Sequence, residues 1–359
     1  MFRFSQHPIL AAAAFSLGVL VATLTNAQKS PQPDETTPSG AIVGTGSFTS
    51  FVEDMDRSLA FYHDLFGMEV PDLPESGERP YNLDNPQLHA MFDIAGARER
   101  HQPASVPGTN VRVEIMEVQD VEFQTLRLRI QDPGAVTLVF IVRDVDAMLA
   151  RAKAQNVNVV TPSGQPILLA DGSRSILIRD LDGRFIELRQ PTNFLADAAT
   201  NGIVDMRLSI AVNDLAHTTQ VYRDVLGFTV EAETALTADP QLRALTGLAT
   251  AEVRRSLVQG PGSSLWIEFV EYQGIDRKPL QMRIQDRGAA RLQLRAENID
   301  DMVSVMKNAG LTVVSEGGIA VPIPPNFKGA LVADPNNFFL TLFAPCVDCG
   351  AAWPTRAAE

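Results

Sequence analysis

Strand-like and helix-like patterns follow each other closely along this sequence. Residues 47–52 mix polar and apolar side chains in the manner of a half-buried β-strand. The next segment, from Asp54 to Gly67, carries apolar side chains on one helical face. Aspartate is a preferred helix N-cap and glycine a preferred C-cap. The pattern therefore predicts a strand followed at once by a helix.

The same order of elements returns further along the chain. A strand over 137–142 precedes a helix capped by Asp144, and a turn at 180–183 leads into a strand over 184–189. The second half repeats these elements as a strand over 208–212, a helix over 214–227, a strand over 292–296 and a turn at 334–337. Strands and helices that alternate in this way predict an α+β fold made of strand–helix–strands units.

The sequence also repeats itself residue by residue. Residues 129–132 read RIQD and so do residues 283–286, an offset of 154. Four further pairs share this offset: Pro86 with Pro240, Glu114 with Glu268, Glu117 with Glu271 and Asp180 with Asp334. Nearer the start of each copy the offset is 160, and there Asp54, Tyr62 and Gly67 match Asp214, Tyr222 and Gly227. These matches indicate a tandem duplication, with copies over 41–192 and 200–345.

The N-terminal segment has the features of a secretory signal. Arg3 precedes a long apolar stretch, and Thr25-Asn26-Ala27 resembles a cleavage site. The apolar stretch is shorter than the roughly 20 residues of a membrane-spanning helix. We therefore expect cleavage of residues 1–27 near Ala27, a flexible Pro-rich tether over 28–40, and a mature protein that is periplasmic or secreted.

Composition and charge restrict the partners of the chain. Its 359 residues are 45% hydrophobic and 20% charged, which is typical of a globular protein and excludes coiled coils and disordered chains. The formal net charge of -13 opposes binding to phosphate backbones and to anionic bilayers. We expect no nucleic-acid partner and no membrane contact beyond the export signal.

The only two cysteines are Cys346 and Cys349, in a C-terminal tail over 346–359. A C-x-x-C pair can be a redox centre, half of a metal site or a small disulfide loop. No second such pair and no nearby histidine completes a zinc site. Because exported proteins meet an oxidising compartment, we expect a local structural disulfide.

Three segments carry a resemblance to a known superfamily. They are DMDRSLAFYHDLFG at 54–67, NDLAHTTQVYRDVLG at 213–227 and DLDGRFIEL at 180–188. They resemble the vicinal oxygen chelate superfamily, which includes glyoxalase I, bleomycin-resistance proteins and extradiol dioxygenases. The resemblance implies four βαβββ modules, and we expect the two modules of each copy to pair into one half-open β cup around a ligand. A tandem chain can be a monomer or a homodimer, because it supplies internally the pairing that single-copy relatives obtain by dimerising.

Metal-dependent relatives carry one ligand seven residues before the helix-capping residue and others on later cup strands. In the first copy, these positions hold Ser47, Glu114, Thr137 and Glu187. Hydroxyls are poor ligands for zinc, nickel or iron. We therefore expect no cofactor, with a divalent cation held by Glu114 and Glu187 in the first cup as the alternative.

The second copy departs further from a metal site. The matching positions hold Arg207, Glu268, Arg291 and Thr341, and strand alternation adds Trp266 and Arg295 to the expected lining. A guanidinium has no lone pair for a metal. The arginines could bind a carboxylate or phosphate while Trp266 stacks on the ligand. They could also pair with Glu268 and fill the cup. None of the histidines is expected on a cup strand, His101 included.

Three functions are compatible with these residues. The first is an exported, metal-free protein that binds a small organic ligand in its cups, as the bleomycin-resistance branch does. The second is a lyase, isomerase or hydrolase in which Glu114 and Glu187 share a proton or act as acid and base. The third is a structural or partner-binding protein whose cups are filled by their own side chains. Extradiol ring cleavage is disfavoured, because no site of two imidazoles and a carboxylate can form.

Overall fold

A computed structural model describes residues 40–81, 85–109, 111–192, 202–346 and 349. The expected signal segment, nearly all of the tether and most of the C-terminal tail lie outside the described residues. All described residues belong to one compact unit, Pro38–Glu359. No helix in these ranges is long and apolar enough to cross a membrane.

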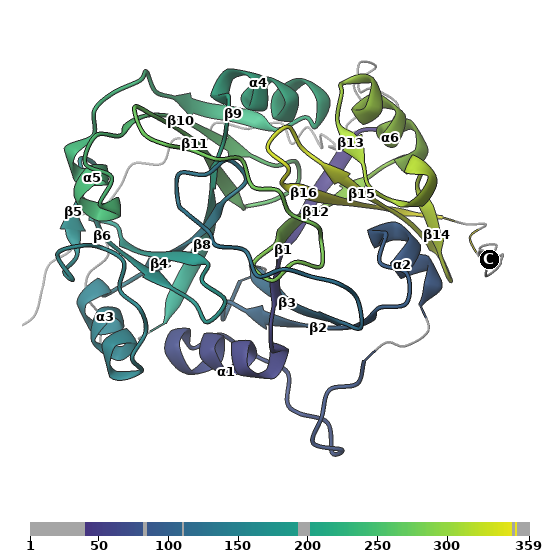
Figure 1. Cartoon of the computed structure of the whole chain (residues 1–359), viewed down its shortest axis with the longest axis horizontal. Coiled ribbons are helices and arrows are strands. Elements are labelled where there is room, and N and C mark those ends of the chain that lie inside the picture. The colour runs from purple at the N-terminus through teal and green to yellow at the C-terminus, as the bar shows by residue number, and fades with distance from the viewer. Residues whose placement is uncertain (1–39, 82–84, 110, 193–201, 347–348, 350–359) are drawn as a thin grey trace, which may run out of the picture. The chain divides into compact units, whose positions relative to one another are not determined.

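The described chain forms four modules of the predicted strand–helix–strands type (Figure 1). Module 1 contains β1 (Ile42–Val52), α1 (Met55–Phe66), α2 (Pro86–Phe92), β2 (Arg98–Ser105) and β3 (Arg112–Gln119). Module 2 contains β4 (Val136–Val142), α3 (Val145–Ala154), β5 (Ile167–Leu168), β6 (Arg174–Arg179) and β7 (Phe185–Gln190). Module 3 contains β8 (Ile203–Ala211), α4 (Leu215–Gln220) with a π-helical turn (Val221–Val225), β9 (Thr229–Glu233), α5 (Pro240–Thr246), β10 (Glu252–Gln259) and β11 (Trp266–Gln273). Module 4 contains β12 (Ala290–Ala296), α6 (Ile299–Asn308), β13 (Thr312–Val313), a 3-10 turn (Glu316–Gly318), β14 (Val321–Ile323), β15 (Phe327–Ala333) and β16 (Phe339–Pro345).

The helices begin where the sequence predicts. The side chain of Asp54 accepts a hydrogen bond from the backbone N–H of Arg57, and Asp144 caps α3 in the same way. Gly67 ends α1 in the left-handed region, at a φ of 69°, which glycine adopts without a steric penalty. The predicted strand–helix boundaries are therefore confirmed.

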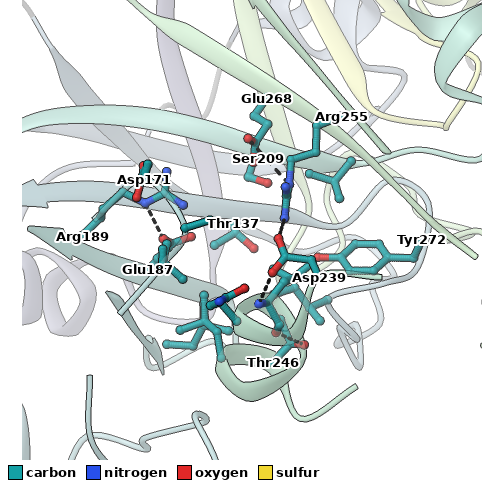
Figure 2. A pocket seen from close by; sticks show the side chains of 18 residues that line it. Thr137, Asp171, Glu187, Arg189, Ser209, Asp239, Thr246, Arg255, Glu268 and Tyr272 are labelled. Atoms are coloured by element: carbon teal, nitrogen blue, oxygen red, sulfur yellow. Dashed lines mark hydrogen bonds and ion pairs between the residues drawn. The ribbon is translucent and has the colours of Figure 1, made fainter. Parts of the chain in front are cut away.

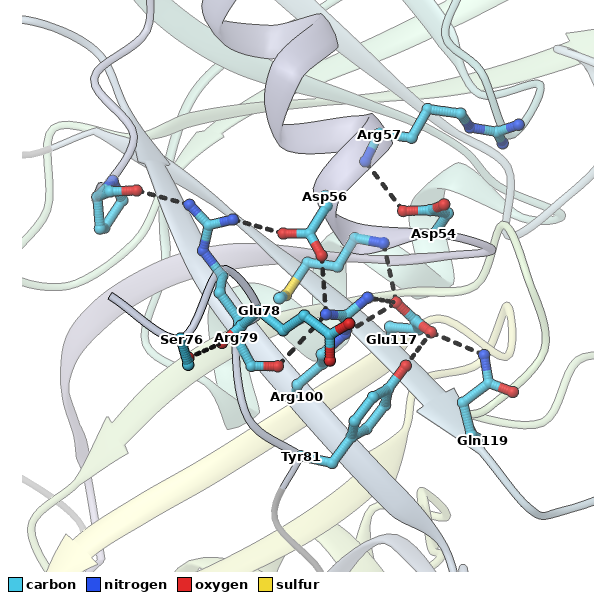
Figure 3. A network of polar contacts seen from close by, with 12 residues as sticks. Asp54, Asp56, Arg57, Ser76, Glu78, Arg79, Tyr81, Arg100, Glu117 and Gln119 are labelled. Atoms are coloured by element: carbon cyan, nitrogen blue, oxygen red, sulfur yellow. Dashed lines mark hydrogen bonds and ion pairs between the residues drawn. The ribbon is translucent and has the colours of Figure 1, made fainter. Parts of the chain in front are cut away.

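A polar network also fixes the start of α1 (Figure 3). The backbone N–H of Met55 donates to Glu117 Oε2 at 3.0 Å, and the same oxygen is 2.7 Å from Arg100 Nη2. In module 3, Glu271 makes the equivalent bond to the N–H of Leu215 at 2.7 Å. Glu117 and Glu271, which are equivalent at offset 154, thus each bind the N-terminus of a helix, where a negative charge is favourable.

The strands form two eight-stranded sheets, and each sheet draws on both copies of the duplication. One has the order β13-β15-β16-β12-β1-β3-β2, with β14 paired to β15, and so combines modules 1 and 4. The other has the order β5-β6-β7-β4-β8-β11-β10-β9 and combines modules 2 and 3. The modules join along the antiparallel pairs β1–β12 and β4–β8. The expectation that each cup lies within one copy is therefore wrong.

Modules of the same copy meet through their helices instead. The helices α1 and α3 pack together (Figure 1). In copy one, the Tyr62 hydroxyl donates to Asp180 Oδ2 at 3.2 Å, and in copy two Tyr222 donates to Asp334 at the same distance. Burial raises the pKa of both aspartates to about 6. The repeated tyrosine and aspartate thus join two modules that contribute to different sheets.

The RIQD repeats lie in the connections that carry the chain from one sheet to the other. Asp132 Oδ1 accepts a hydrogen bond from the backbone N–H of Lys278, and Asp286 Oδ1 accepts one from Gln124, both at 2.9 Å. Each copy's aspartate therefore holds the other copy's connection. This reciprocal contact explains why the motif recurs at offset 154.

Alternation along the strands divides the core into two clusters. Phe48 and Val52 of β1 pack with helix residues such as Leu59 on the helix-covered face of the sheet. Phe51 points to the opposite face, where it packs with Met116 and Phe339. The concave faces of the sheets are thus partly filled by apolar side chains, and polar residues complete their lining.

Candidate functional site

The sheet pairing distributes the predicted site residues over two concave faces, which we name the β1–β12 cup and the β4–β8 cup after their central strands. Ser47, Glu114, Arg291, Arg295 and Thr341 lie on strands of the β1–β12 cup. Thr137, Glu187, Arg207, Trp266 and Glu268 lie on strands of the β4–β8 cup.

This distribution corrects two expectations. Glu114 and Glu187 belong to different sheets, so they neither share a proton nor hold one cation between them. Arg291 is likewise in a different sheet from Glu268, so the expected pairing of both arginines with Glu268 does not form.

Arg291 occupies the centre of the β1–β12 cup. Its side chain is only 4% exposed, its Nη1 donates to Thr341 Oγ1 at 3.2 Å, and its guanidinium carbon is 4.6 Å from the centre of the Phe92 ring. Burial lowers the pKa of Arg291 to about 10, although Glu114 opposes the shift. This arginine is therefore held inside the protein as a packed, strongly desolvated charge.

The other polar residues of this cup bond to one another. Glu114 Oε2 accepts hydrogen bonds from Gln293 Nε2 at 3.0 Å and from Thr49 Oγ1 at 3.5 Å. Arg295 is exposed at the rim. His101, contrary to expectation, lies on a cup strand, β2, where a hydrogen bond to Glu99 raises its pKa. These contacts fill the centre of the β1–β12 cup with side chains of the protein itself, and a hollow of about 410 Å³ lies at its edge beside Gln293, Arg295 and Phe343.

The β4–β8 cup, in contrast, contains a cavity of about 190 Å³ (Figure 2). Thr137, Ser209 and Glu268 form a row across β4, β8 and β11, because they are direct partners in the sheet. Helix α5 contributes Leu242 and Leu245 to the lining. The cavity therefore has a polar row on the sheet and an apolar contribution from a short helix.

One wall of the cavity contains the buried carboxylate of Glu187, which accepts hydrogen bonds from two side chains. Glu187 Oε1 accepts hydrogen bonds from Ser175 Oγ at 2.5 Å and from Arg189 Nε at 2.7 Å. The carboxylate of Glu187 raises the pKa of Arg189 above its usual range. The pair is thus charge-compensated within the protein.

A second arginine lies beside α5. Arg255 Nη2 is 2.8 Å from Asp239 Oδ2, and Asp239 also caps α5 by accepting from the N–H of Leu242 at 2.8 Å. Burial alone would raise the pKa of Asp239, but these two donors outweigh it and the pKa is lowered. Arg255 Nε is also 3.9 Å from Glu268 Oε1, and the Glu268 side chain is 32% exposed. Glu268 is therefore a carboxylate with a loose protein contact and access to solvent.

Two predicted residues of this cup do not line the cavity. Arg207 and Trp266 are neighbours on β8 and β11, and both are half-buried outside the cavity lining. Strand alternation predicts Ser209 on the cup face beside Arg207, and Ser209 does line the cavity. The sequence carries no signal for other lining residues, among them Asp171, Asp239 and Arg255.

The donor set does not fit the divalent metal of metal-dependent relatives. Glu187 and Glu268 stand at two of the ligand positions, but the other two hold Thr137 and Arg207. Each carboxylate has an arginine beside it, at 2.7 Å from Glu187 and at 3.9 Å from Glu268. In the described ranges, no group of three or more His, Cys, Asp or Glu residues could hold a metal ion.

At the end of the described chain, Cys346 and Cys349 are joined by a disulfide bond, with their Cα atoms 5.5 Å apart. The two intervening residues lie outside the described part. The bond joins residues three positions apart in the sequence, just after β16.

Two cross-copy sheets, each with a concave polar face, define a tandem βαβββ protein. The sequence profile of the Glyoxalase/Bleomycin resistance protein/Dioxygenase superfamily matches residues 44–188 and 205–321, well over half of the chain. The chain belongs to this superfamily.

Solved structures agree with this assignment at the level of the fold. Glyoxalase I from Zea mays superposes with a TM-score of 0.53 at 16% identity, over 85% of this chain and 92% of the maize chain. A single-residue mutant of glyoxalase I from Zea mays gives a TM-score of 0.52 at 15% identity, over 85% and 94% of the two chains. A search of curated protein sequences gave no significant match.

Proposed function

We propose that this protein binds a small organic ligand in the β4–β8 cup without a metal ion. The cavity of about 190 Å³ beside Glu268 is the observation that carries this proposal. Metal chemistry is a poor fit, because arginines stand next to the carboxylates that a cation would need. The opposite cup is closed by Arg291, which leaves the β4–β8 cup as the better candidate for a ligand.

The lining indicates the chemistry of the ligand. Asp171, Glu187, Asp239 and Glu268 bring four carboxylates, whereas Arg189 and Arg255 bring two guanidiniums. The arginines bond to Glu187 and Asp239 at 2.7 and 2.8 Å, so Glu268 keeps the most hydrogen-bonding capacity. An excess of negative charge favours a ligand with an amino group or several hydroxyl donors.

The size of the cavity and its apolar side restrict the ligand further. Typical pockets for drug-sized ligands measure about 300–1,000 Å³, so this cavity suits a smaller metabolite. Leu242 and Tyr272 offer apolar surface away from Glu268. Burial raises the pKa of the Tyr272 phenol, which therefore stays protonated and neutral at physiological pH. We infer a small amine or amino alcohol with a short apolar part.

Calorimetric titration of metal-stripped protein with a panel of small amines, amino alcohols and amino acids tests this proposal. We expect binding by at least one amine, with affinity reduced about tenfold in Glu268→Gln, because a hydrogen bond to a charged group is lost. Glu114→Gln is the matched control, since it makes the same change at the repeat-equivalent position in the filled cup. Equal losses in both variants, or no binding in the panel, would contradict the proposal.

The same titration repeated with added zinc, nickel or manganese tests the absence of a metal requirement. We expect no gain in affinity and no stoichiometric metal in purified protein. Tight metal binding that disappears in Glu187→Gln or Glu268→Gln would show that the cup holds a cation after all.

We further propose that the protein is exported. The N-terminal pattern supports export, and the disulfide between Cys346 and Cys349 is of a kind that persists in oxidising compartments. Fractionation of a bacterial expression host should place the protein in the periplasm, with an intact mass that starts at Gln28. A full-length, reduced protein in the cytoplasm would contradict this proposal.

A further inference from the structure

A second cleft, of about 450 Å³, lies where the two sequence copies face each other. Its lining includes Thr109 and Val111 of the β2–β3 turn, and Ser263 and Leu265 of the β10–β11 turn. These pairs are equivalent at offset 154. The cleft therefore lies between equivalent turns of the two copies. It shares no residue with the cavity of the β4–β8 cup.

The walls of this cleft are set by close packing at two glycines. A Cβ on Gly262, which has a φ of +59°, would lie 2.9 Å from the carbonyl oxygen of Val43. A Cβ on Gly260 would lie 2.0 Å from Thr45 Oγ1. The β10–β11 turn is thus packed directly against β1, and only glycine fits there. The cleft is therefore bounded by fixed backbone.

The cleft is lined mainly by hydroxyl groups and carries one charge. Thr45, Ser47, Ser105, Thr109, Ser263 and Ser264 supply the hydroxyls, and Arg112 is the single charged residue of the lining. Ser47 is only 5% exposed, and no described residue forms a hydrogen bond with its Oγ. Its Oγ is closed off from solvent, so a partner in the cleft would meet exposed hydroxyls such as those of Thr109 and Ser264 instead.

Arg112 is available to such a partner. Its side chain is 48% exposed, and its Nη2 is 3.6 Å from Glu114 Oε1, a distance too long for a strong hydrogen bond. The other oxygen of Glu114 is already held by Gln293. A half-exposed ion pair of this kind is weak, so the guanidinium can turn to an anion in the cleft at little cost.

We propose that this cleft binds a hydroxylated organic anion, that is, a polyol or sugar that carries a carboxylate or a phosphate. Arg112 would pair with the anionic group, because a guanidinium forms two parallel hydrogen bonds to either. The exposed serine and threonine hydroxyls of the lining would pair with the ligand hydroxyls. The volume of about 450 Å³ lies within the range of typical ligand pockets.

Titration of the full chain with gluconate, glycerol 3-phosphate, glucose and inorganic phosphate tests the proposal. We expect binding of gluconate or glycerol 3-phosphate, weaker binding of glucose and weaker binding of inorganic phosphate. Arg112→Gln should weaken binding of the anionic polyol about tenfold, because a charge-assisted bond is removed. Ser264→Ala should weaken it about threefold, by loss of one neutral hydrogen bond from an exposed residue of the lining.

Arg98→Gln is the control, because it removes a half-exposed arginine of the same sheet that does not line this cleft. Unchanged affinity in this control is expected. Equal loss in Arg112→Gln and Arg98→Gln would overturn the proposal, as would phosphate binding as tight as that of the polyols. Loss of binding in Glu268→Gln but not in Arg112→Gln would place the ligand in the β4–β8 cup instead. Unchanged affinity in Ser264→Ala would contradict the pairing of ligand hydroxyls with this lining.

Discussion

At the scale of single residues, the two cups differ most at one repeated position. Thr137 on β4 and Arg291 on β12 are equivalent at offset 154, and each lies at the central seam of its sheet. The short threonine side chain lines the cavity inside the β4–β8 cup. The longer arginine side chain extends into the β1–β12 cup and packs on Phe92. A change in side-chain length at this position therefore accounts for one open and one filled cup.

Arg291 should be replaceable by an apolar side chain of similar length. A buried charge has a desolvation cost that its partners only partly offset, so we expect Arg291→Met to change the free energy of unfolding by less than about 1 kcal/mol. Arg291→Ala should lose about 3 kcal/mol, because it leaves a cavity. Urea denaturation measures both, and a methionine variant as unstable as the alanine variant would contradict this view.

Thr137→Arg tests the same idea in the open cup. The new guanidinium should occupy the cavity as Arg291 occupies its counterpart, and ligand affinity should fall at least tenfold, because the space is filled. The fold should be retained, since Arg291 stands at the equivalent position of the other sheet. Calorimetry gives the affinity and circular dichroism the fold. Undiminished binding in a folded Thr137→Arg variant would show that the ligand lies elsewhere.

The buried aspartates predict a pH dependence of stability. Burial raises the pKa of Asp180 and Asp334 to about 6, well above the value of about 3.8 in an unfolded chain. The folded state then binds these protons more tightly, so this contribution is complete below about pH 4 and is lost as the pH rises through 6. The stability of wild type relative to Asp180→Asn should therefore decrease between pH 4 and pH 7, by on the order of 2 kcal/mol.

Asp334→Asn offers the matched comparison, because Asp334 bonds to Tyr222 as Asp180 bonds to Tyr62. Both variants should show the same trend in urea titrations at several pH values. A difference from wild type that stays constant with pH would mean that both carboxyl groups are ionised throughout.

At the scale of elements, α5 links stability to the ligand cavity. Asp239 caps this helix and bonds to Arg255, so Asp239→Ala should cost about 1–2 kcal/mol of stability and also weaken ligand binding. Asn85 caps the equivalent helix α2 by accepting from the N–H of Leu88, away from the cavity. Asn85→Ala should cost about 1 kcal/mol and leave ligand affinity unchanged. Equal effects on affinity would mean that α5 acts only through global stability.

Local patterns predicted the elements well and the missing site residues poorly. Asp54, Asp144 and Gly67 marked helix ends because capping depends on a few adjacent residues. Arg255 was not predicted, because its role depends on a carboxylate that only folding brings near. Arg255 meets Asp239, from another element, only in the folded chain. Such pairs leave no periodic signal in the sequence.

At the scale of the whole molecule, the repeat revealed the duplication but not which modules share a sheet. The sequences of β1 and β4 show similar alternation of polar and apolar residues. This pattern does not say whether each strand pairs with a strand of its own copy or of the other copy. The structure chooses β1 with β12 and β4 with β8. The RIQD connections favour this choice, because Asp132 and Asp286 hold the opposite copy. That contact is not recognisable before the fold is known.

The cross-copy pairing predicts a monomer in solution. Both central seams, β1–β12 and β4–β8, are satisfied inside one chain, so no second chain is needed to complete a cup. Size-exclusion chromatography with light scattering should give the mass of one chain at micromolar concentration. A stable dimer would indicate that an outer surface, away from the seams, forms an interface.

The pairing of β1 with β12 has a consequence for biosynthesis. Ile42 of β1 pairs with Ala296 of β12, which is 254 positions later in the sequence. The strand β1 is therefore synthesised long before the strand with which it pairs. Contacts of such long sequence separation form slowly. During translation, β1 and β3 would remain a sheet fragment with an open edge, and the whole cup closes only after release from the ribosome. Slow closure of this sheet would suit the proposed export, because a chain that crosses a membrane pore does so before it folds.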